Sequence, residues 1–410
     1  MRKRGCVSIR MQTRQDHKVN TLTATEKLIV PVRASTAPFT NPGSIVFDQA
    51  TNSFVGRGNR AAMPVSNRVV STFNTGVTPA GIAITPDSTI AYVANNNNYS
   101  TTNQDSVTVL DLVAGLPLTT IHDPSFLGPY TVTLNSAGTK AYVTNSTGST
   151  VSVIDTATNT VTNVITGFDG PSGMVINGDI AYVNNYGATP GVGSGNGTTV
   201  RVVDLINNVI IGSPITVGLA PAALAITHDG ASVYVANYVD GNTNTATLSQ
   251  ISTTSNTVVA TIGPFSPNGF SGPFAIAITP DDTTAYVTNF GSNNFVPIGT
   301  SVSVVDLATQ TVTDAIEVGI QPSGIAITPD GSKAFVSNYN TLYAYVVPPT
   351  TYDNLTAGRG TVNIIDLASG VVVAPTINVD QSPDFIAITP DGKYALVSNY
   401  TSGSVSMIAV

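Results

Sequence analysis

The sequence predicts an all-β fold, a seven-bladed β-propeller whose blades are four-stranded sheets. One observation behind this prediction is a motif that recurs seven times after residue 78: a proline, an apolar run, a tight turn and a Tyr-Val-x-Asn segment. A second is its period of about 40–60 residues, the length of a propeller blade. A third is that a segment missing from the last copy occurs before the first copy, as a closed ring requires. The repeats begin at Pro79, Pro129, Pro171, Pro221, Pro273, Pro322 and Pro383.

The first two strands of each blade are predicted from the start of the repeat. The run after the proline is apolar on both faces, which favours a buried strand lining the centre of the ring. The TPDG turn then reverses the chain, because Pro presets φ, Asp binds nearby backbone groups and Gly tolerates positive φ. The AYVTN-like segment that follows is the second strand. The clearest first strands have the sequence IAIT, at 82–85, 276–279, 325–328 and 386–389.

The third strand is predicted from alternation, because Ser, Thr or Arg alternates with Val or Ile at period two. The fourth strand, TNTVTNVITG at 158–167 and its counterparts, is polar enough for the outer edge of the ring. Third strands are expected at 105–112, 149–155, 198–205, 300–307 and 360–367.

The two ends of the repeat region fit together. The last copy stops after its third strand, SVSMIAV at 404–410, and NRVVSTFNTG at 67–76 closely matches the fourth-strand segment. We therefore expect residues 67–410 to form the propeller, with the N-terminal strand joining the last blade. Such closure removes the open sheet edges that a linear array would leave.

With its AYVTN strand, SVSVID strand and TPDG turn, the repeat resembles the YVTN family of β-propeller repeats over residues 68–410. That resemblance implies a protein of the surface-layer or cell-surface type, with a more distant likeness to lactonase-type propellers. It implies a display or binding role more than one particular chemistry, because propellers host many unrelated activities.

Residues 41–66 are expected to form a β-hairpin connector before the propeller. The segment NPGSIVFDQATNSFVGRGN at 41–59 has a strand, turn and strand pattern. It resembles the GSIVYDTTTNKFYGYNG segment that recurs in phage-tail, fibre and other virion-associated proteins. The resemblance implies a virion-like setting, and an ordinary hairpin packing beside the propeller is the alternative.

Charge divides the chain into a basic start and an acidic remainder. Residues 1–68 hold eleven of the sixteen Lys and Arg and a balance of +8, whereas residues 69–410 have a balance of −16. We expect residues 1–40 to be an extended arm for assembly or tethering on acidic neighbouring subunits. Nucleic acid is not favoured, because the dense basic clusters with aromatics of such binders are missing. The basic residues assigned to the arm are Arg2, Lys3, Arg4, Arg10, Arg14 and Lys18.

The start of the chain does not resemble a signal peptide, because no run of 7–15 apolar residues follows its charges; an Arg-rich transit peptide is the alternative. No stretch approaches 18 apolar residues, so no membrane span is expected. The surface must be built mostly from Thr, Ser and Asn, which is typical of exterior β proteins. We expect an extracellular, virion or cell-surface location.

Function is expected where the repeat is interrupted. The connections between second and third strands swell in five copies, and a propeller brings them to one face. Long loops on one face indicate a binding surface, and aromatic side chains are typical of recognition. The alternative is that these loops pack on one another or on a neighbouring copy. The candidate partner-binding residues are Tyr99, Tyr186, Phe295, Tyr343, Tyr345, Tyr352 and Arg359.

Residues that recur once per blade are expected to be structural instead. The Asp at the end of the third strand and the Asn at the end of the second strand suit turns and their hydrogen bonds. The Asp positions are Asp111, Asp155, Asp204, Asp306 and Asp366. The Asn positions are Asn95, Asn145, Asn185, Asn237, Asn289, Asn338 and Asn399.

The segment DGNTN at 240–244 is a candidate calcium site. Asp240, Asn242 and Asn244 place oxygen ligands at alternate positions, as at the opening of a calcium loop. Position twelve of such a loop is Ile251 rather than Glu, so the match is incomplete. No other metal ligands and no cofactor are expected.

The sequence thus predicts a non-enzymatic structural or adhesive subunit on the exterior of a cell, virion or filament. Its partners would be other protein subunits of an assembly, or a surface receptor or glycan. The alternative is a lactonase-type hydrolase with a divalent metal in the central channel. That reading has few candidate residues, because the propeller region contains one glutamate, Glu317, and two histidines, and the chain has no GxSxG motif.

Overall fold

The computed structural model describes residues 45–48, 53–56, 66–97, 105–187, 195–238, 246–263, 270–291, 298–340 and 359–410. The chain divides into two compact units, residues 1–64 and 65–410. In the first unit, β1 (Ile45–Asp48) and β2 (Ser53–Gly56) pair as an antiparallel hairpin. This pairing is the one that the strand, turn and strand pattern predicts.

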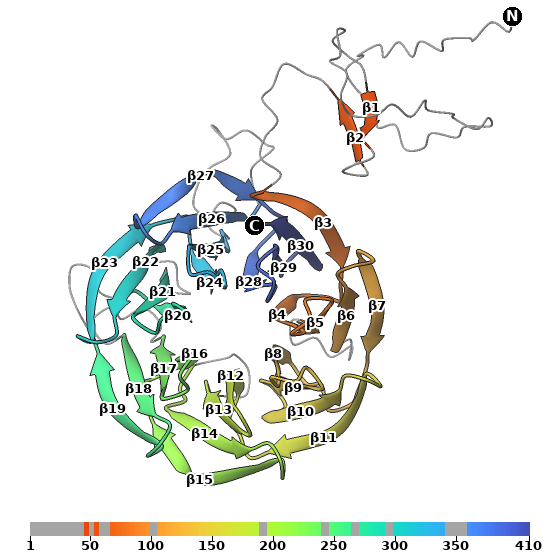
Figure 1. The fold of residues 1–410 in the computed structure, drawn as a ribbon. Helices are drawn as coiled ribbons and strands as arrows, with labels where there is room; N and C mark the ends of the chain where they lie inside the picture. The colour runs from red at the N-terminus through yellow and green to blue at the C-terminus, as the bar shows by residue number, and fades with distance from the viewer. Residues whose placement is uncertain are drawn as a thin grey trace, which may run out of the picture. The chain divides into compact units, whose positions relative to one another are not determined.

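The second unit is a ring of seven four-stranded antiparallel sheets, which confirms the predicted β-propeller (Figure 1). We number these blades 1 to 7 in chain order, so that blade 1 is β4 to β7. The strands nearest the centre are β4 (Pro79–Ile84), β8 (Pro129–Leu134), β12 (Pro171–Asn177), β16 (Pro221–Ile226), β20 (Pro273–Ile278), β24 (Pro322–Ile327) and β28 (Pro383–Ile388).

The innermost strands begin earlier than the IAIT pattern predicts, at the repeat proline itself. In blade 1, Pro79 is paired with Asn95, and the register then shifts before Ile82 pairs with Val93. Proline is tolerated there because the first residue of a strand need not donate a ladder hydrogen bond. This irregular start brings the residues after the proline to the inner wall of the ring.

The second strand is buried almost throughout in every blade. In β5, for example, every residue after Ile90 is buried. Because both faces of the blade are covered by neighbouring blades, these strands are apolar on both sides. They are β5 (Ile90–Asn95), β9 (Lys140–Asn145), β13 (Ile180–Asn185), β17 (Ser232–Asn237), β21 (Thr284–Gly291), β25 (Lys333–Asn338) and β29 (Tyr394–Asn399).

The third strands follow the predicted positions to within a residue or two in the repeats where they were expected. They pair with the second strands without a register shift in six blades, and the pairing of β21 with β22 shifts only beyond Asn289. They are β6 (Ser106–Asp111), β10 (Thr150–Asp155), β14 (Thr199–Asp204), β18 (Thr247–Ser252), β22 (Ile298–Asp306), β26 (Thr361–Asp366) and β30 (Ser404–Ala409).

The outer strands form the rim. In β3 and β19 exposed residues alternate with more buried ones, whereas β7 is exposed from Leu116 to Thr120. In every blade, the pairing of the third strand with the outer strand contains a bulge or similar irregularity. Bulges increase local twist, which suits strands at the edge of a blade. The outer strands are β7 (Leu116–Ile121), β11 (Thr160–Thr166), β15 (Val209–Thr216), β19 (Thr257–Ile262), β23 (Thr311–Glu317), β27 (Val371–Asn378) and β3 (Arg68–Asn74).

The N-terminal strand closes the ring as predicted. β3 pairs with β30, from Arg68 opposite Ala409 to Asn74 opposite Ser404. Phe73 is buried in a cluster that contains Val405 and Leu396 of blade 7. Blade 7 therefore consists of β28, β29, β30 and β3, and it takes strands from both ends of the propeller sequence.

The hydrophobic core lies between neighbouring blades rather than in one central mass. In one cluster, Tyr92 and Val109 of blade 1 pack with Val132, Val143 and Ile154 of blade 2. Each blade thus buries its faces against the next, which is how repeat units that cannot fold alone become stable.

Candidate functional site

The strand register sends every connection between second and third strands to one face of the propeller. In blade 1, Asn95 pairs both with Pro79 and with Ser106, so the start of β4, the end of β5 and the start of β6 lie together. We call this side the loop face. Its connections are residues 96–105, 146–149, 186–198, 238–246, 292–297, 339–360 and 400–403. The turns on the opposite side, such as 85–89 and 112–115, stay short.

The recurring asparagines fasten the roots of the loop face. Asn95 Nδ2 donates to Ser106 Oγ at 3.1 Å and to Thr108 Oγ1 at 2.9 Å, while its Oδ1 accepts from Gly76 N at 3.1 Å. A Cβ at Gly76 would lie 2.7 Å from Asn95 Cγ, so only glycine allows this approach. The structural role predicted for these asparagines is confirmed.

The recurring aspartates are also structural, on the opposite side of the propeller. Asp155 Oδ1 accepts from Ala157 N and from Thr158 N, both at 3.0 Å, which forms the turn between third and fourth strands. These hydrogen bonds hold the pKa of Asp155 below its usual value, with the backbone bond from Thr158 as the largest cause. The aspartates therefore form no ring of catalytic carboxylates.

Aromatic rings form an arc beneath the loop face. Phe274, Tyr238 and Phe290 form a triangle of rings. The centroid of Phe274 lies 6.1 Å from that of Tyr238 and 5.2 Å from that of Phe290, and the last two are 6.5 Å apart. The arc continues from Phe290 to Tyr339 at 6.0 Å and from Tyr339 to Tyr400 at 6.2 Å. We call these five residues the aromatic arc. It supports the loop face over blades 4 to 7.

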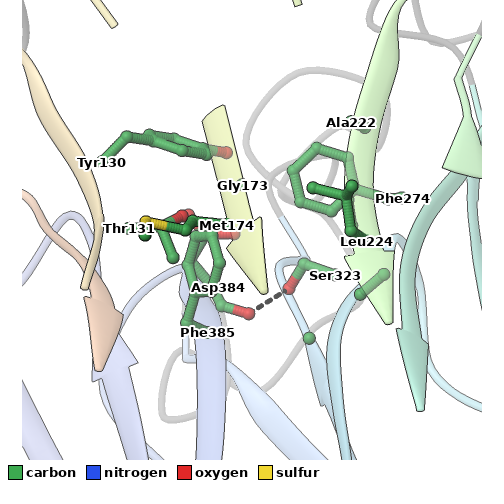
Figure 2. A pocket seen from close by; sticks show the side chains of 13 residues that line it. Tyr130, Thr131, Gly173, Met174, Ala222, Leu224, Phe274, Ser323, Asp384 and Phe385 are labelled. Carbon is green, nitrogen blue, oxygen red and sulfur yellow. Dashed lines mark hydrogen bonds between the residues drawn. The ribbon is translucent and has the colours of Figure 1, made fainter. Parts of the chain in front are cut away.

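A cavity lies at the loop-face end of the central channel, lined by the residues that follow the repeat prolines (Figure 2). The cavity has a volume of about 100 Å³, where one water needs roughly 10–15 Å³. Figure 2 shows Tyr130 and Phe385 on one side of this hollow and Phe274 and Leu224 on the other. Ser323 Oγ donates to the Asp384 carbonyl oxygen at 2.9 Å and closes blade 6 against blade 7.

Asp384 is the one ionisable carboxyl group among the residues that line this cavity. Only 6% of its surface is exposed. Ser323 and Ser337 donate hydrogen bonds to the backbone carbonyl oxygen of Asp384. Within the described part of the chain, no residue donates a hydrogen bond to its carboxylate oxygens. Burial raises the pKa of Asp384 to about 7. The channel mouth therefore holds a desolvated carboxyl group without a counter-charge.

Of the partner-binding residues predicted from sequence, the structure describes two. Tyr186 is half-buried and packs against the cluster that contains Tyr238 and Phe290, whereas Arg359 is exposed at the end of the longest connection. The others, Tyr99, Phe295, Tyr343, Tyr345 and Tyr352, lie outside the described residues. So do the calcium candidates Asp240, Asn242 and Asn244 and the arm residues Arg2, Lys3, Arg4, Arg10, Arg14 and Lys18.

Sequence reasoning missed Asp384 and all five residues of the aromatic arc. The signal for the arc is the residue after the repeat asparagine, which is aromatic in five of seven copies: Tyr186, Tyr238, Phe290, Tyr339 and Tyr400. The signal for Asp384 is a charged residue within an inner strand that is otherwise apolar.

In the described ranges, no group of three or more His, Cys, Asp or Glu side chains is placed to hold a metal ion. The same ranges contain no helix with the length and apolar character to cross a membrane.

Comparison with known proteins supports the fold but identifies no family. No protein-family model matches the chain. The PE-PGRS family protein PE_PGRS18 of Mycobacterium tuberculosis is 52% identical over 58 residues, which are 14% of this chain and 12% of that protein. The chain thus matches about an eighth of that relative's length.

A solved chain of Kuenenia stuttgartiensis hydrazine synthase is similar with a TM-score of 0.66 and 19% identity. The similarity covers 86% of this chain and 99% of that chain. At this identity it shows the propeller fold alone, and the resemblance to the YVTN family stays a prediction.

Proposed function

We propose that the protein is a non-enzymatic binding subunit, displayed on the exterior of a cell, virion or filament, that docks a partner through its loop face. The observation that carries this proposal is the asymmetry of the propeller. Every long connection emerges on one side, while the turns on the other side stay short. Insertions on one face of a repeat scaffold are typical of a recognition surface.

The base of the loop face suits such a role. The asparagine bonds and the aromatic arc hold the roots of the connections in place. A rigid base lowers the entropy that a loop surface loses on binding, and this favours affinity. The partner would be another protein subunit, a surface receptor or a glycan.

The basic arm supplies the second part of the proposal. Its charge is opposite to that of the propeller sequence, −16 over residues 69–410, so an arm that contacts neighbouring copies would be attracted to them. The PE-PGRS protein matches too little of the chain to support a location or a partner.

The loop face can be tested by trimming two of its connections. Residues 188–194 and 341–358 would each be replaced by a short Gly-Ser link, and labelled protein would be applied to a glycan array and to cells of the producing organism. We expect at least a tenfold loss of retained protein. The matched control inserts a Gly-Ser segment into the opposite-side turn at 205–208, and it should bind as the natural chain does.

Retention that survives both loop replacements, or that is lost only in the control, would contradict a docking role for this face. The alternative, a hydrolase with a metal in the channel, predicts a stoichiometric divalent ion in the purified protein. Elemental analysis before and after chelation measures that ion directly.

A further inference from the structure

Asp384 differs from every residue at the same place in the other blades. The position directly after the repeat proline is apolar, aromatic or a serine elsewhere, and in blade 7 alone it carries a carboxyl group. The equivalent residues of blades 1 to 6 are Ala80, Tyr130, Ser172, Ala222, Phe274 and Ser323. The blade repeat therefore does not need a charge at this position.

The surroundings of Asp384 can be compared with those of Phe274, its equivalent in blade 5. Phe274 packs against both Tyr238 and Phe290, and the rings at the two corresponding positions of blades 6 and 7 are Tyr339 and Tyr400. The pKa of Tyr339 is raised, first by burial and then by the nearby charge of Asp384. A carboxyl group thus stands where the aromatic arc has a ring in blade 5.

No cation of the described chain neutralises Asp384. The Lys and Arg side chains of the described ranges do not line the cavity. A carboxylate that is removed from water and left without a partner is strongly disfavoured, and a bound cation relieves that cost. The net negative charge of the propeller sequence favours a cation further.

The walls of the cavity suit one kind of cation. Tyr130 and Phe385 meet edge to face with ring centroids 5.4 Å apart, and Phe274, Met174 and Leu224 add apolar surface. Aromatic faces attract cations that carry methyl or methylene groups, because the ring quadrupole is negative at the face. A divalent metal would need several oxygen ligands, whereas one carboxyl group lines this cavity.

We propose that the channel mouth binds a small organic cation, whose ammonium group pairs with the Asp384 carboxylate and whose alkyl groups contact the rings of Tyr130, Phe274 and Phe385. This site lies at the channel, so it is separate from docking of a large partner by the loops. The cation is either a free small molecule or the ammonium group of a lysine that enters the channel.

Isothermal titration calorimetry of the full chain at pH 8 tests the charge requirement. The probes are choline and 3,3-dimethylbutan-1-ol, which have the same shape and differ by one positive charge. We expect choline to bind at least about tenfold more tightly than the neutral alcohol. Equal affinities, or no saturable binding of choline, would overturn the proposal.

Two variants assign the binding to the proposed residues. Asp384→Asn should remove the preference for choline, whereas Asp314→Asn, an exposed carboxyl group on the rim in β23, should keep it with the same loss of charge. Phe385→Leu keeps the carboxyl group and should weaken choline binding about threefold to tenfold. If Asp384→Asn fails to fold, Phe385→Leu still decides, because unchanged choline binding there contradicts the aromatic wall.

The source of the cation is settled by a third probe, a blocked Gly-Lys-Gly peptide. Tighter binding of choline than of the peptide assigns the site to a free small molecule, and the reverse assigns it to a lysine side chain. Either result supports an ammonium site at Asp384, provided that the Asp384→Asn variant loses it.

Discussion

At the scale of single residues, repetition and function separate. Asn95 and Asp155 represent positions that recur around the ring, and their polar atoms are used in hydrogen bonds within the blade. Asp384 occurs once and has no such partner for its carboxylate in the described chain. A residue that departs from the repeat without a structural partner is therefore the stronger functional candidate.

The tyrosine of the repeat motif links neighbouring blades. Tyr182 Oη donates to Asn256 Oδ1 at 2.6 Å, in a turn of the next blade. Tyr182→Phe should lower the free energy of unfolding by about 1 kcal/mol, because a partly buried hydrogen bond is lost while the ring stays. Urea denaturation followed by circular dichroism measures this change.

A matched variant controls for loss of the hydroxyl group alone. Tyr234 occupies the same place in blade 4, and no described residue is hydrogen-bonded to its hydroxyl. Tyr234→Phe should leave the free energy of unfolding nearly unchanged. Equal losses in the two variants would show that the bond to Asn256 does not link the blades energetically.

Asp384 should make stability depend on pH with a sign opposite to that of ordinary aspartates. The pKa of Asp384 is about 7 in the folded chain and 3.8 for an ordinary aspartate, so the unfolded chain releases this proton first as pH rises. The contribution of Asp384 to the free energy of unfolding is largest below about pH 4, declines between pH 4 and pH 7, and is constant above pH 7. The loss is at most roughly 4 kcal/mol.

Asp384→Asn does not titrate and isolates this effect. The free energy of unfolding of the variant minus that of the natural chain should rise between pH 4 and pH 7 and level off above pH 7. Urea titrations at pH 4, 5.5, 7 and 8 give this difference, from which the other aspartates cancel. The neighbouring Tyr339 has a pKa raised by burial, and it stays protonated throughout. Parallel curves for the two proteins would exclude a raised pKa.

At the scale of elements, the repeat was sufficient to predict the blades and the closing strand. Alternation and turn residues placed the third strands near their observed bounds. A buried face fixes the register, because a shift by one residue would turn the apolar side chains to the other face. The start of the first strand at Pro79 was missed, because a proline usually indicates the end of a strand, whereas Pro79 pairs with Asn95. The cavity was missed because its lining comes from different blades, which only the closed ring brings together.

The closing strand can be removed by shortening the chain from its N-terminal side, which also removes Gly76 and its hydrogen bond to Asn95 of blade 1. A chain that begins at Ser66 keeps β3, whereas a chain that begins at Val77 leaves β30 with an unpaired edge and removes Phe73 from the core of blade 7. Loss of a buried Phe side chain alone costs about 3–5 kcal/mol. We expect the shorter chain to melt at a lower temperature and to associate through its open edge.

Circular dichroism and size-exclusion chromatography of the two truncated proteins measure both effects. The chain from Ser66 is the control, and it should melt as the full chain does. If the chain from Val77 is monomeric and equally stable, the pairing of β3 with β30 is not what closes the ring.

At the scale of the whole molecule, the N-terminal segment and the propeller differ in the sign of their charge. The propeller sequence is acidic and the first 68 residues are basic, with balances of −16 and +8. Such a pair favours association between copies more than it stabilises one copy, because net charge acts on encounters rather than on fold.

Deletion of residues 1–40 should therefore abolish assembly and leave the propeller folded. The deleted segment holds eight of the eleven basic residues of the first 68. Sedimentation velocity should show assemblies of the full chain at low salt that dissociate as the salt concentration rises. The reason is that the Debye screening length falls from about 10 Å at 0.1 M salt to about 3 Å at 1 M. Replacement of Arg2, Lys3, Arg4, Arg10, Arg14 and Lys18 by Gln tests charge without changing length and should act like the deletion. Assembly of the truncated protein that equals that of the full chain would remove the arm from the proposed function.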